Sequence, residues 1–253
     1  MIDPRAHAAK VPAITLGFWV IKVIATTLGE TGGDSVSMTL DWGYLAATAL
    51  FAGVLVALVW AQVAATRFRP WLYWATIVAS TTAGTTLADF ATRSLGIGYP
   101  GGSLLLLAGV LGTLLAWYRT LGTVSVSSVS TRAAECFYWA TITFSQTLGT
   151  ALGDWTADTD GIGYGGAAGI FGAGLLLLAL LYFGTRVSRT MLFWAAFILT
   201  RPLGATVGDF LDKPVAKGGL DFSRPLATAV LAAAIVLLIA LLPQRAAGSE
   251  DNA

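Results

Sequence analysis

The sequence predicts an all-α membrane protein of eight transmembrane helices, arranged as four parallel two-helix repeats. Three observations lead to this prediction. The 253-residue chain is 56% hydrophobic and 11% charged, whereas soluble domains carry about 25% charged residues. A short motif recurs four times along the chain. Eight apolar runs each approach the ~20 residues that cross a bilayer as a helix, and they lack the period-two alternation of a barrel strand.

The repeated motif is a small residue, three others, a second small residue and an aspartate. A tryptophan precedes each copy by ten residues, and the copies are 55, 65 and 55 residues apart. Such periodic self-similarity indicates one structural unit that is used several times. The copies begin at Gly29, Gly84, Gly149 and Gly204, end at Asp34, Asp89, Asp154 and Asp209, and follow Trp19, Trp74, Trp139 and Trp194.

The chain divides around these copies. Lys22 interrupts the first apolar run and no small-residue cleavage site follows it, so we expect this run to be retained rather than removed as a signal peptide. The tail after residue 243 is polar, which is typical of a flexible end. The predicted segments are a cytoplasmic N-terminal segment (1–10), repeat 1 (11–63), repeat 2 (64–119), an inter-half linker (120–131), repeat 3 (132–184), repeat 4 (185–243) and a flexible cytoplasmic tail (244–253).

The apolar runs give each repeat two crossings. Every copy therefore starts on the same side of the membrane, and the repeats are parallel rather than inverted. The runs lie near residues 11–28, 40–62, 71–88, 102–118, 134–152, 165–183, 190–208 and 225–242.

The loop charges predict the orientation. Cytoplasmic loops are enriched in Lys and Arg, and one side of the predicted bundle carries more of both. We therefore expect both termini in the cytoplasm and the four repeated aspartates near the outer face. The richer side holds Arg5, Lys10, Arg67, Arg69, Arg119, Arg132, Arg186, Arg189 and Arg245, against Arg93, Lys213, Lys217 and Arg224 on the other side.

Candidate site residues lie on one face of the first helix of each repeat, because positions four apart line up on a helix. If the four faces converge, they line a central cavity that becomes more polar toward the aspartates. The faces read Lys22, Thr26, Glu30, Asp34; Ile77, Thr81, Thr85, Asp89; Ile142, Gln146, Thr150, Asp154; and Phe197, Arg201, Ala205, Asp209. The predicted pathway residues are Asp34, Asp89, Asp154, Asp209, Glu30, Lys22, Arg201, Thr26, Thr81 and Gln146.

Any metal site must use oxygen ligands. The chain has one histidine, His7, and one cysteine, Cys136, whereas zinc and copper prefer nitrogen and sulfur ligands. Carboxylates suit hard ions such as Mg²⁺, Ca²⁺, Mn²⁺ or Na⁺. The candidate metal ligands are Asp34, Asp89, Asp154 and Asp209, and the possible cofactor is a bound hard cation.

Structural roles compete with these functional ones. Small residues four apart are a common packing device between membrane helices, so Gly29, Gly84, Gly149 and Gly204 are expected to bring helices together. The four tryptophans are expected to pack between copies. The aspartates could instead be turn residues. Lys22 and Arg201 are expected to pair with one another or with the aspartates, because charges inside a membrane are costly.

The tryptophan and Gly-to-Asp columns carry a family resemblance over the whole chain. Four tandem repeats of two membrane segments with a tryptophan resemble the bacterial repeat-containing integral membrane proteins of unknown function. The resemblance implies this architecture and a bacterial inner-membrane location. It implies no reaction, since such members are described only as uncharacterised membrane-anchored proteins. The fourth copy departs from the pattern at Pro202, Lys213 and Lys217.

Three function classes remain open. The acidic outer side and the polar inner face favour a transporter or permease for a small solute, most simply a cation. A scaffold or sensor that binds partners through its arginine-bearing loops is the alternative. An intramembrane enzyme is less favoured, because the common catalytic motifs are absent, and we expect no enzyme activity. The net charge of +1 gives no reason to expect a nucleic-acid partner, so the expected partners are the bilayer and the solute.

Overall fold

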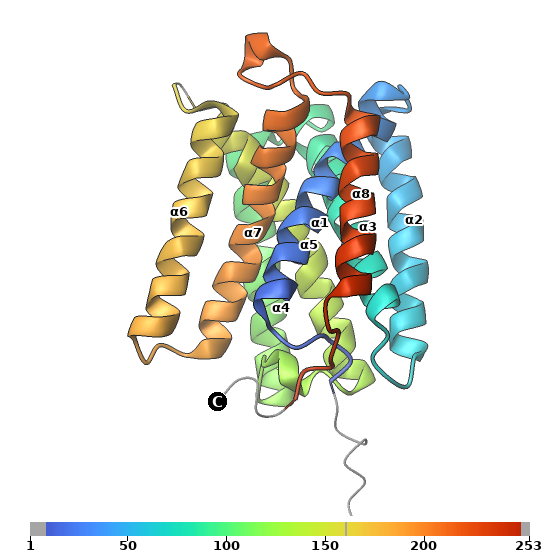
Figure 1. Ribbon diagram of the computed structural model, residues 1–253, viewed down its shortest axis with the longest axis vertical. Coiled ribbons are helices and arrows are strands. Elements are labelled where there is room, and N and C mark those ends of the chain that lie inside the picture. The colour runs from blue at the N-terminus through green and yellow to red at the C-terminus, as the bar shows by residue number, and fades with distance from the viewer. Residues whose placement is uncertain (1–8, 160, 249–253) are drawn as a thin grey trace, which may run out of the picture.

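The computed structural model describes residues 9–159 and 161–248, and these residues form eight α-helices (Figure 1). The predicted all-α class is confirmed. Five helices, α2, α4, α6, α7 and α8, are long and apolar enough to cross a membrane, so this is a helical, membrane-embedded protein. The helices are α1 (Leu16–Asp34), α2 (Gly43–Ala64), α3 (Pro70–Asp89), α4 (Gly98–Leu121), α5 (Arg132–Ala157), α6 (Gly163–Gly184), α7 (Arg189–Asp212) and α8 (Arg224–Leu241).

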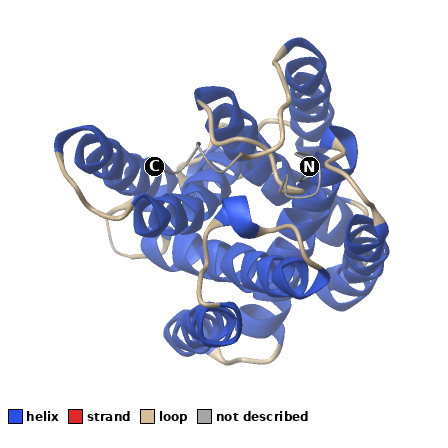
Figure 2. Ribbon diagram, turned by 90° about the horizontal axis from the view of Figure 1, so that it is seen from below, coloured by secondary structure: helices blue, strands red, loops and turns tan. Residues whose placement is uncertain are grey.

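The first helices of the four repeats form an inner ring. Helix α1 packs against α3 and α7, and α5 packs against the same two helices. Each second helix covers the first helix of the following repeat: α2 packs on α3, α4 on α5 and α6 on α7. The ring closes because α7 packs against α1, and α8 covers α1 as the other second helices cover their neighbours (Figure 1). The four repeats are therefore arranged around one axis, as the view along the bundle shows (Figure 2).

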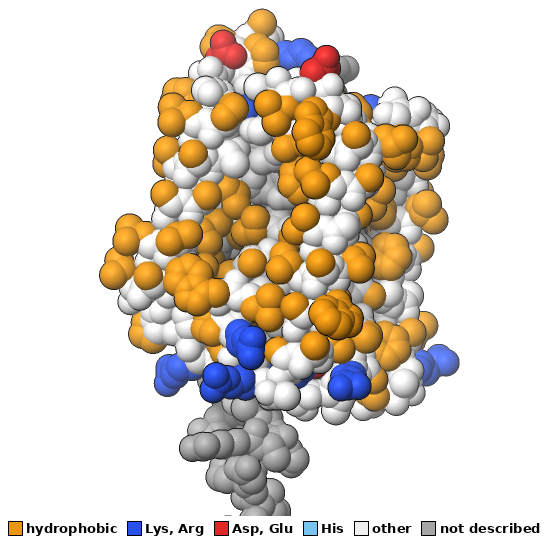
Figure 3. All heavy atoms as spheres, turned by 90° about the vertical axis from the view of Figure 1, so that its right-hand side faces the viewer, with side chains coloured by type: hydrophobic (Ala, Val, Ile, Leu, Met, Phe, Trp, Pro, Cys, Tyr) orange, Lys and Arg blue, Asp and Glu red, His pale blue; other side chains and the backbone are white. Residues whose placement is uncertain are grey.

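Polarity is distributed in the opposite sense to that of a water-soluble bundle. Large apolar side chains such as Trp60, Leu176 and Leu237 are exposed on the outer helices, whereas the inner helices bury many Thr, Ser and charged side chains. Figure 3 shows a hydrophobic band between a row of Lys and Arg at one end and a mixed charged group at the other. Such an apolar exterior suits a bilayer, and the polar residues face the interior, as membrane proteins require.

Both termini of the described chain lie at one end of the bundle, which we call the terminal end. Pro12 and Ala246 form an isolated antiparallel bridge. Ala13 N–H donates to Arg245 C=O at 2.8 Å, and Ala247 N–H donates to Val11 C=O at 2.8 Å. Residues 244–248, predicted to belong to a flexible tail, are thus held by backbone bonds. The rest of that tail, 249–253, and residues 1–8 of the N-terminal segment lie outside the described residues.

The predicted inter-half linker also belongs to the terminal end. Helix α4 continues to Leu121, two residues into this segment, and a short 3₁₀ turn follows at Val126–Ser128. Lys10 N–H donates to Val129 C=O at 2.8 Å, and Val126 and Val129 are buried. The linker therefore packs beneath the ring and joins the N-terminal segment to the second half of the chain.

The opposite end of the bundle, which we call the aspartate end, carries the loops that join the two helices of each repeat. Short π-helical turns follow α1 and α3 directly after Asp34 and Asp89. Gly43, Gly98 and Gly163 then adopt φ values of +74°, +71° and +63° at the starts of α2, α4 and α6. Only glycine adopts this backbone conformation freely. This explains the glycine of a Gly-Tyr pair that recurs in the first three repeats, at residues 43–44, 98–99 and 163–164. The tyrosine that follows each glycine lies at the aspartate end.

Candidate functional site

The four predicted faces do converge: all their residues are buried within the ring of α1, α3, α5 and α7. Because equivalent positions lie at the same height in each repeat, they form four layers along the axis. From the terminal end, the layers are Lys22, Ile77, Ile142 and Phe197; Thr26, Thr81, Gln146 and Arg201; Glu30, Thr85, Thr150 and Ala205; and Asp34, Asp89, Asp154 and Asp209.

Below these layers, aromatic side chains close the terminal end. In every repeat, one aromatic ring contacts the repeated tryptophan of the next repeat, so the contacts run around the axis. The ring centroids are 5.5 Å apart for Phe18–Trp74, 5.7 Å for Tyr73–Trp139, 6.1 Å for Tyr138–Trp194 and 5.8 Å for Phe193–Trp19. The hydroxyl groups of Tyr73 and Tyr138 also lie 2.6 Å apart. The tryptophans thus join neighbouring repeats near the starts of their helices.

The repeated glycines lie where neighbouring inner helices approach most closely. Each faces the second-layer residue of the next repeat, and an added Cβ would overlap it. That Cβ would lie 2.0 Å from Thr81 Oγ1 at Gly29, 2.9 Å from the Gln146 carbonyl carbon at Gly84, 2.2 Å from Arg201 Cγ at Gly149 and 2.1 Å from Thr26 Oγ1 at Gly204. The missing side chains therefore give the ring its small diameter, which brings the polar layers together.

Arg201 fills the axis at the level of the second and third layers. Its Nη1 lies 3.0 Å from Glu30 Oε2, and its Nη2 donates to Thr85 Oγ1 at 2.6 Å and to Thr150 Oγ1 at 2.5 Å. It also donates to the carbonyl of Thr81 on α3. One guanidinium from α7 thus contacts the other three inner helices. Its carboxylate partner is Glu30, not one of the predicted aspartates.

Lys22 differs from the expected pairing. Its Nζ lies 3.4 Å from Thr200 Oγ1 and 4.1 Å from the centre of the Phe197 ring. Among the described residues it has no carboxylate partner. The reason is its position: Glu30 lies two turns further along α1, about 12 Å away at 1.5 Å per residue. Gln146, a fully buried neighbour in the next layer, also leaves both its amide atoms without a partner among the described residues.

The fourth layer contains two ion-pair groups, which we call the first and second half-sites. In the first half-site, between α7 and α1, Lys213 bridges Asp209 at 3.0 Å and Asp34. In the second, between α3 and α5, Arg93 bridges Asp89 at 2.9 Å and Asp154 at 3.0 Å. Each cation follows the aspartate of its own repeat by four residues and reaches the aspartate of the next repeat. All four aspartates are therefore brought together in pairs rather than as one open ring.

The first half-site has a third carboxylate. Glu30, Asp34 and Asp209 each present an oxygen atom, and these atoms lie within 4.8 Å of one another. All three residues are buried. At the equivalent place in the second half-site, the third-layer residue is Thr150. The structure thus places two of the four predicted metal ligands beside Glu30 and places the other two in a separate group.

Lys213 is held firmly in its charged form. It immediately follows α7, and burial alone lowers the pKa of its ammonium group. The negative charges of Asp209, Asp34 and Asp212 outweigh this effect and raise the pKa well above its ordinary value of 10.5. The loop around Lys213 is tightly folded, because its carbonyl accepts a hydrogen bond from Asp221 N–H at 3.0 Å. The first half-site therefore contains a permanent, covalently attached cation.

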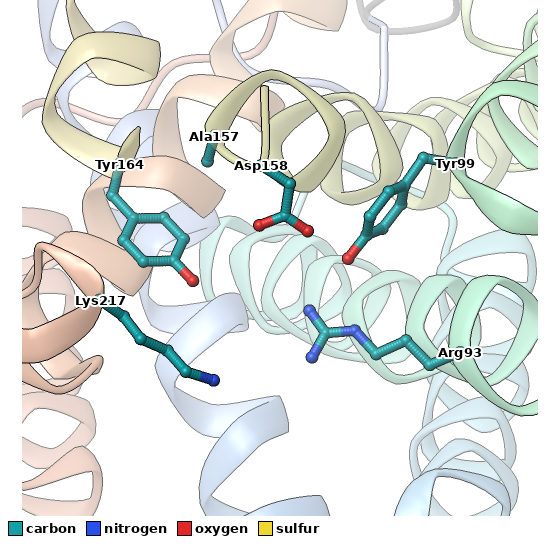
Figure 4. A pocket seen from close by; sticks show the side chains of 6 residues that line it. All are labelled: Arg93, Tyr99, Ala157, Asp158, Tyr164 and Lys217. Atoms are coloured by element: carbon teal, nitrogen blue, oxygen red, sulfur yellow. The ribbon is translucent and has the colours of Figure 1, made fainter. Parts of the chain in front are cut away.

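A cavity of about 340 Å³ opens at the aspartate end beside the second half-site. Arg93 lines it together with Tyr99, Asp158, Tyr164 and Lys217, and Figure 4 shows these side chains facing the same space. Two members of the Gly-Tyr column thus line this cavity. We refer to it as the vestibule.

Sequence reasoning did not include Arg93, Lys213 or the vestibule residues among the candidate site residues. A signal for the two cations was present. The fourth position after the repeated aspartate is Arg93 in repeat 2 and Lys213 in repeat 4, but Met38 and Asp158 in repeats 1 and 3. This alternation predicts a cation between alternate pairs of repeats. The vestibule had no comparable signal, because its lining comes from loops whose placement depends on the closed ring.

Comparison with known proteins supports the repeat architecture. No curated protein and no solved structure matches the chain. The profile of the family described as "Repeat of Unknown Function (DUF347)" matches four times, at residues 17–68, 72–123, 137–188 and 192–245. These matches confirm the resemblance seen in the sequence and cover most of the chain. The protein therefore belongs to the DUF347 repeat family and contains four tandem copies of its repeat.

Proposed function

We propose that the protein is a membrane transporter for a small solute that carries a positive charge, most simply a cation. The observation that supports this proposal most strongly is the first half-site, where three buried carboxylates lie within 4.8 Å of one another. Buried carboxylates require a compensating positive charge. Oxygen ligands at this spacing suit a hard cation or an ammonium group.

Lys213 supplies that charge in the described conformation. Its ammonium contacts Asp34 and Asp209, so an arriving cation has to displace it. Lys213 belongs to the α7–α8 loop rather than to an inner helix, and a loop side chain moves at less cost than a packed helix. In this proposal Lys213 is a tethered competitor: it fills the site when no solute is bound and leaves when solute binds.

Two groups of side chains lie between this site and the terminal end. The Arg201 guanidinium fills the axis next to Glu30, and the aromatic residues pack across the terminal end. Release on that side therefore requires the inner helices to move apart. Rocking of one half of the ring against the other is the usual way in which repeat-built transporters expose a central site alternately to each side.

For the membrane arrangement, we propose that all eight helices cross the bilayer with both termini in the cytoplasm. Helices α1 and α3 bury most of their Thr and charged residues inside the ring, which explains why they are less apolar than the outer helices. The Lys and Arg side chains at the terminal end match the positive-inside rule. The aspartate end then faces outward, as expected for a protein of the bacterial inner membrane.

Binding by the purified protein gives the first test. Thermal unfolding is measured in detergent with Mg²⁺, Ca²⁺, Mn²⁺, Na⁺ and methylammonium. A cation that binds only the folded state stabilises it by about 2.7 kcal/mol at 100 times its Kd. Glu30→Gln, Asp34→Asn and Asp209→Asn should each remove this stabilisation. Asp89→Asn is the matched control from the second half-site and should retain it.

Transport is then measured in proteoliposomes with the cation that gives the shift. Uptake should depend on Glu30 and be retained by the control variant. The proposal is wrong if no cation is bound or carried, or if binding and uptake persist after all three substitutions in the first half-site.

A further inference from the structure

The vestibule combines opposite charges that have few protein partners. Lys217 projects from the α7–α8 loop and Asp158 from the end of α5, on different sides of the cavity (Figure 4). Among the described residues, neither takes part in an ion pair. Lys217 and Asp158 are exposed to solvent. The Asp158 carboxylate accepts a hydrogen bond from the Tyr99 hydroxyl. The cavity thus offers one ammonium group and one carboxylate that no ion pair among the described residues neutralises.

The remaining lining is dominated by hydrogen-bond donors. Arg93 uses Nε on Asp89 and Nη2 on Asp154, and its Nη1 lies 3.5 Å from Tyr44 Oη. A guanidinium has five N–H groups, so Arg93 retains donors after these contacts. The hydroxyl group of Tyr164 points into the same space (Figure 4), and that of Tyr99 is engaged with Asp158. An anionic group placed beside Lys217 would therefore meet several donors.

The size of the vestibule limits the ligand. Pockets for drug-sized ligands range from about 300 to 1,000 Å³, and the vestibule lies at the lower end, at about 340 Å³. Its lining is polar, and Ala157 is the one apolar lining residue among those described. A small, highly polar molecule fits this space better than an apolar one.

We propose that the vestibule binds a small organic zwitterion that carries one carboxylate and one ammonium group. The carboxylate lies against Lys217 and Arg93 with the Tyr164 hydroxyl beside it, and the ammonium lies against Asp158. The inference deepens the proposed function and rests on it in one respect: the bound zwitterion is the transported solute. Its ammonium group then suits the three carboxylates of the first half-site, which lie deeper in the ring.

The position of Arg93 connects the two sites. It lines the vestibule and also bridges Asp89 to Asp154. A carboxylate that binds the remaining N–H groups of Arg93 lies beside both aspartates. Occupation of the vestibule therefore adds a negative charge next to the bridge between α3 and α5.

The test is isothermal titration calorimetry on the full chain in detergent with three matched probes: 4-aminobutyrate, butylamine and butyrate. The zwitterion should bind at least about tenfold more tightly than either singly charged analogue, because it gains a second charged contact. Lys217→Gln and Asp158→Asn should each reduce its affinity about tenfold. Arg67→Gln, an exposed cation at the terminal end, is the control and should have no effect.

Two results would overturn the inference. One is equal affinity for the zwitterion and a singly charged analogue, which would describe a simple anion or cation site. The other is unchanged zwitterion affinity in both vestibule variants. The Glu30→Gln variant separates this inference from the proposed function: it removes cation binding at the first half-site but leaves Lys217-dependent binding in the vestibule intact.

Discussion

The two half-sites are built from the same repeat positions but contain different chemistry. The first holds three carboxylates and the Lys213 ammonium, and the second holds two carboxylates and the Arg93 guanidinium. A lysine ammonium is a compact point charge on a flexible stem, whereas a guanidinium is a rigid fork that suits paired carboxylates. The second half-site thus has one guanidinium for two carboxylates. In the first, Lys213 shares the three carboxylates with Arg201, which pairs with Glu30, and with Arg224, whose Nε lies 3.9 Å from Asp34.

Under the proposed function, this difference separates a structural role from a functional one within a single fold. Asp89 and Asp154 are satisfied by Arg93 and join α3 to α5 at the aspartate end. Asp34 and Asp209 make the equivalent connection between α7 and α1, but Glu30 adds a third negative charge, which pairs with Arg201 at 3.0 Å. The following experiments test whether Glu30 and Lys213 account for the difference, in order of decreasing expected effect.

The largest effect is expected for Arg201→Ala, which leaves Glu30 charged and buried without its partner. Removal of one member of a buried ion pair costs about 3–5 kcal/mol. The measurement is the free energy of unfolding in mixed detergent. The double variant Glu30→Thr with Arg201→Ala should regain much of the loss, because Thr is the residue that the second half-site uses at this level. Wild-type stability of Arg201→Ala would contradict the assignment of the pair.

Glycine substitutions should affect both half-sites alike. Gly204 faces Thr26 and Gly84 faces the Gln146 backbone, at the interfaces that carry the first and second half-sites. An alanine at either position overlaps its neighbour, and overpacking costs about 1–3 kcal/mol. The same unfolding measurement on Gly53→Ala is the control, because nothing lies within 4 Å of a Cβ there. Unequal losses at Gly84 and Gly204 would show that the two interfaces do not have equivalent packing.

If Lys213 is a tethered competitor, its removal should strengthen cation binding, whereas the preceding substitutions weaken the fold. Lys213→Gln removes the ammonium from Asp34 and Asp209, so cation affinity should rise about tenfold, or about 1.4 kcal/mol. Arg93→Gln should leave that affinity unchanged, because the second half-site lacks the third carboxylate. Each variant is titrated with the cation that stabilises the wild type, relative to its own cation-free state. A fall in affinity in Lys213→Gln would identify Lys213 as a support for the site, not a competitor.

The smallest effect concerns pH. The pKa of Lys213 is raised above 10.5 in the folded protein, so its contribution to stability is complete below the unfolded pKa and is lost only as pH rises through the higher folded pKa. The stability that wild type holds over Lys213→Met should therefore not decline between pH 7 and 9. Across this pH range, the first half-site should then keep its cation charged, as the second half-site does with Arg93. A difference that falls across this range would indicate early loss of the Lys213 proton.

The sequence was sufficient to predict the helices and the converging polar faces, since both follow from local periodicity. Thr26, Glu30 and Asp34 could be assigned to one buried face because positions four apart on a helix share a side. The order of helices around the axis could not be obtained this way. That α2 covers α3, and α8 covers α1, depends on packing between repeats.

Which charged residues pair with each other depends on this order of the helices around the axis. Lys22 and Arg201 both have carboxylates in the same or a neighbouring repeat, but only Arg201 lies at the height of one. Arg93 and Lys213 each reach the aspartate of the following repeat, and for Lys213 this contact with Asp34 requires the ring to close from repeat 4 to repeat 1. The residues were all visible in the sequence, and the missing information was which repeats are neighbours.

Because the last helix covers the first, the ring has no intrinsic starting point. Every inner helix is flanked by two others and covered by the helix that precedes it around the circle, and α1 obtains its cover from α8. The Pro12–Ala246 bridge brings the two ends of the described chain together beneath the ring. A circular permutant that joins these ends and opens the chain between α4 and α5 would therefore keep every helix neighbour. By the same geometry, two chains of two repeats each could complete the circle as a dimer.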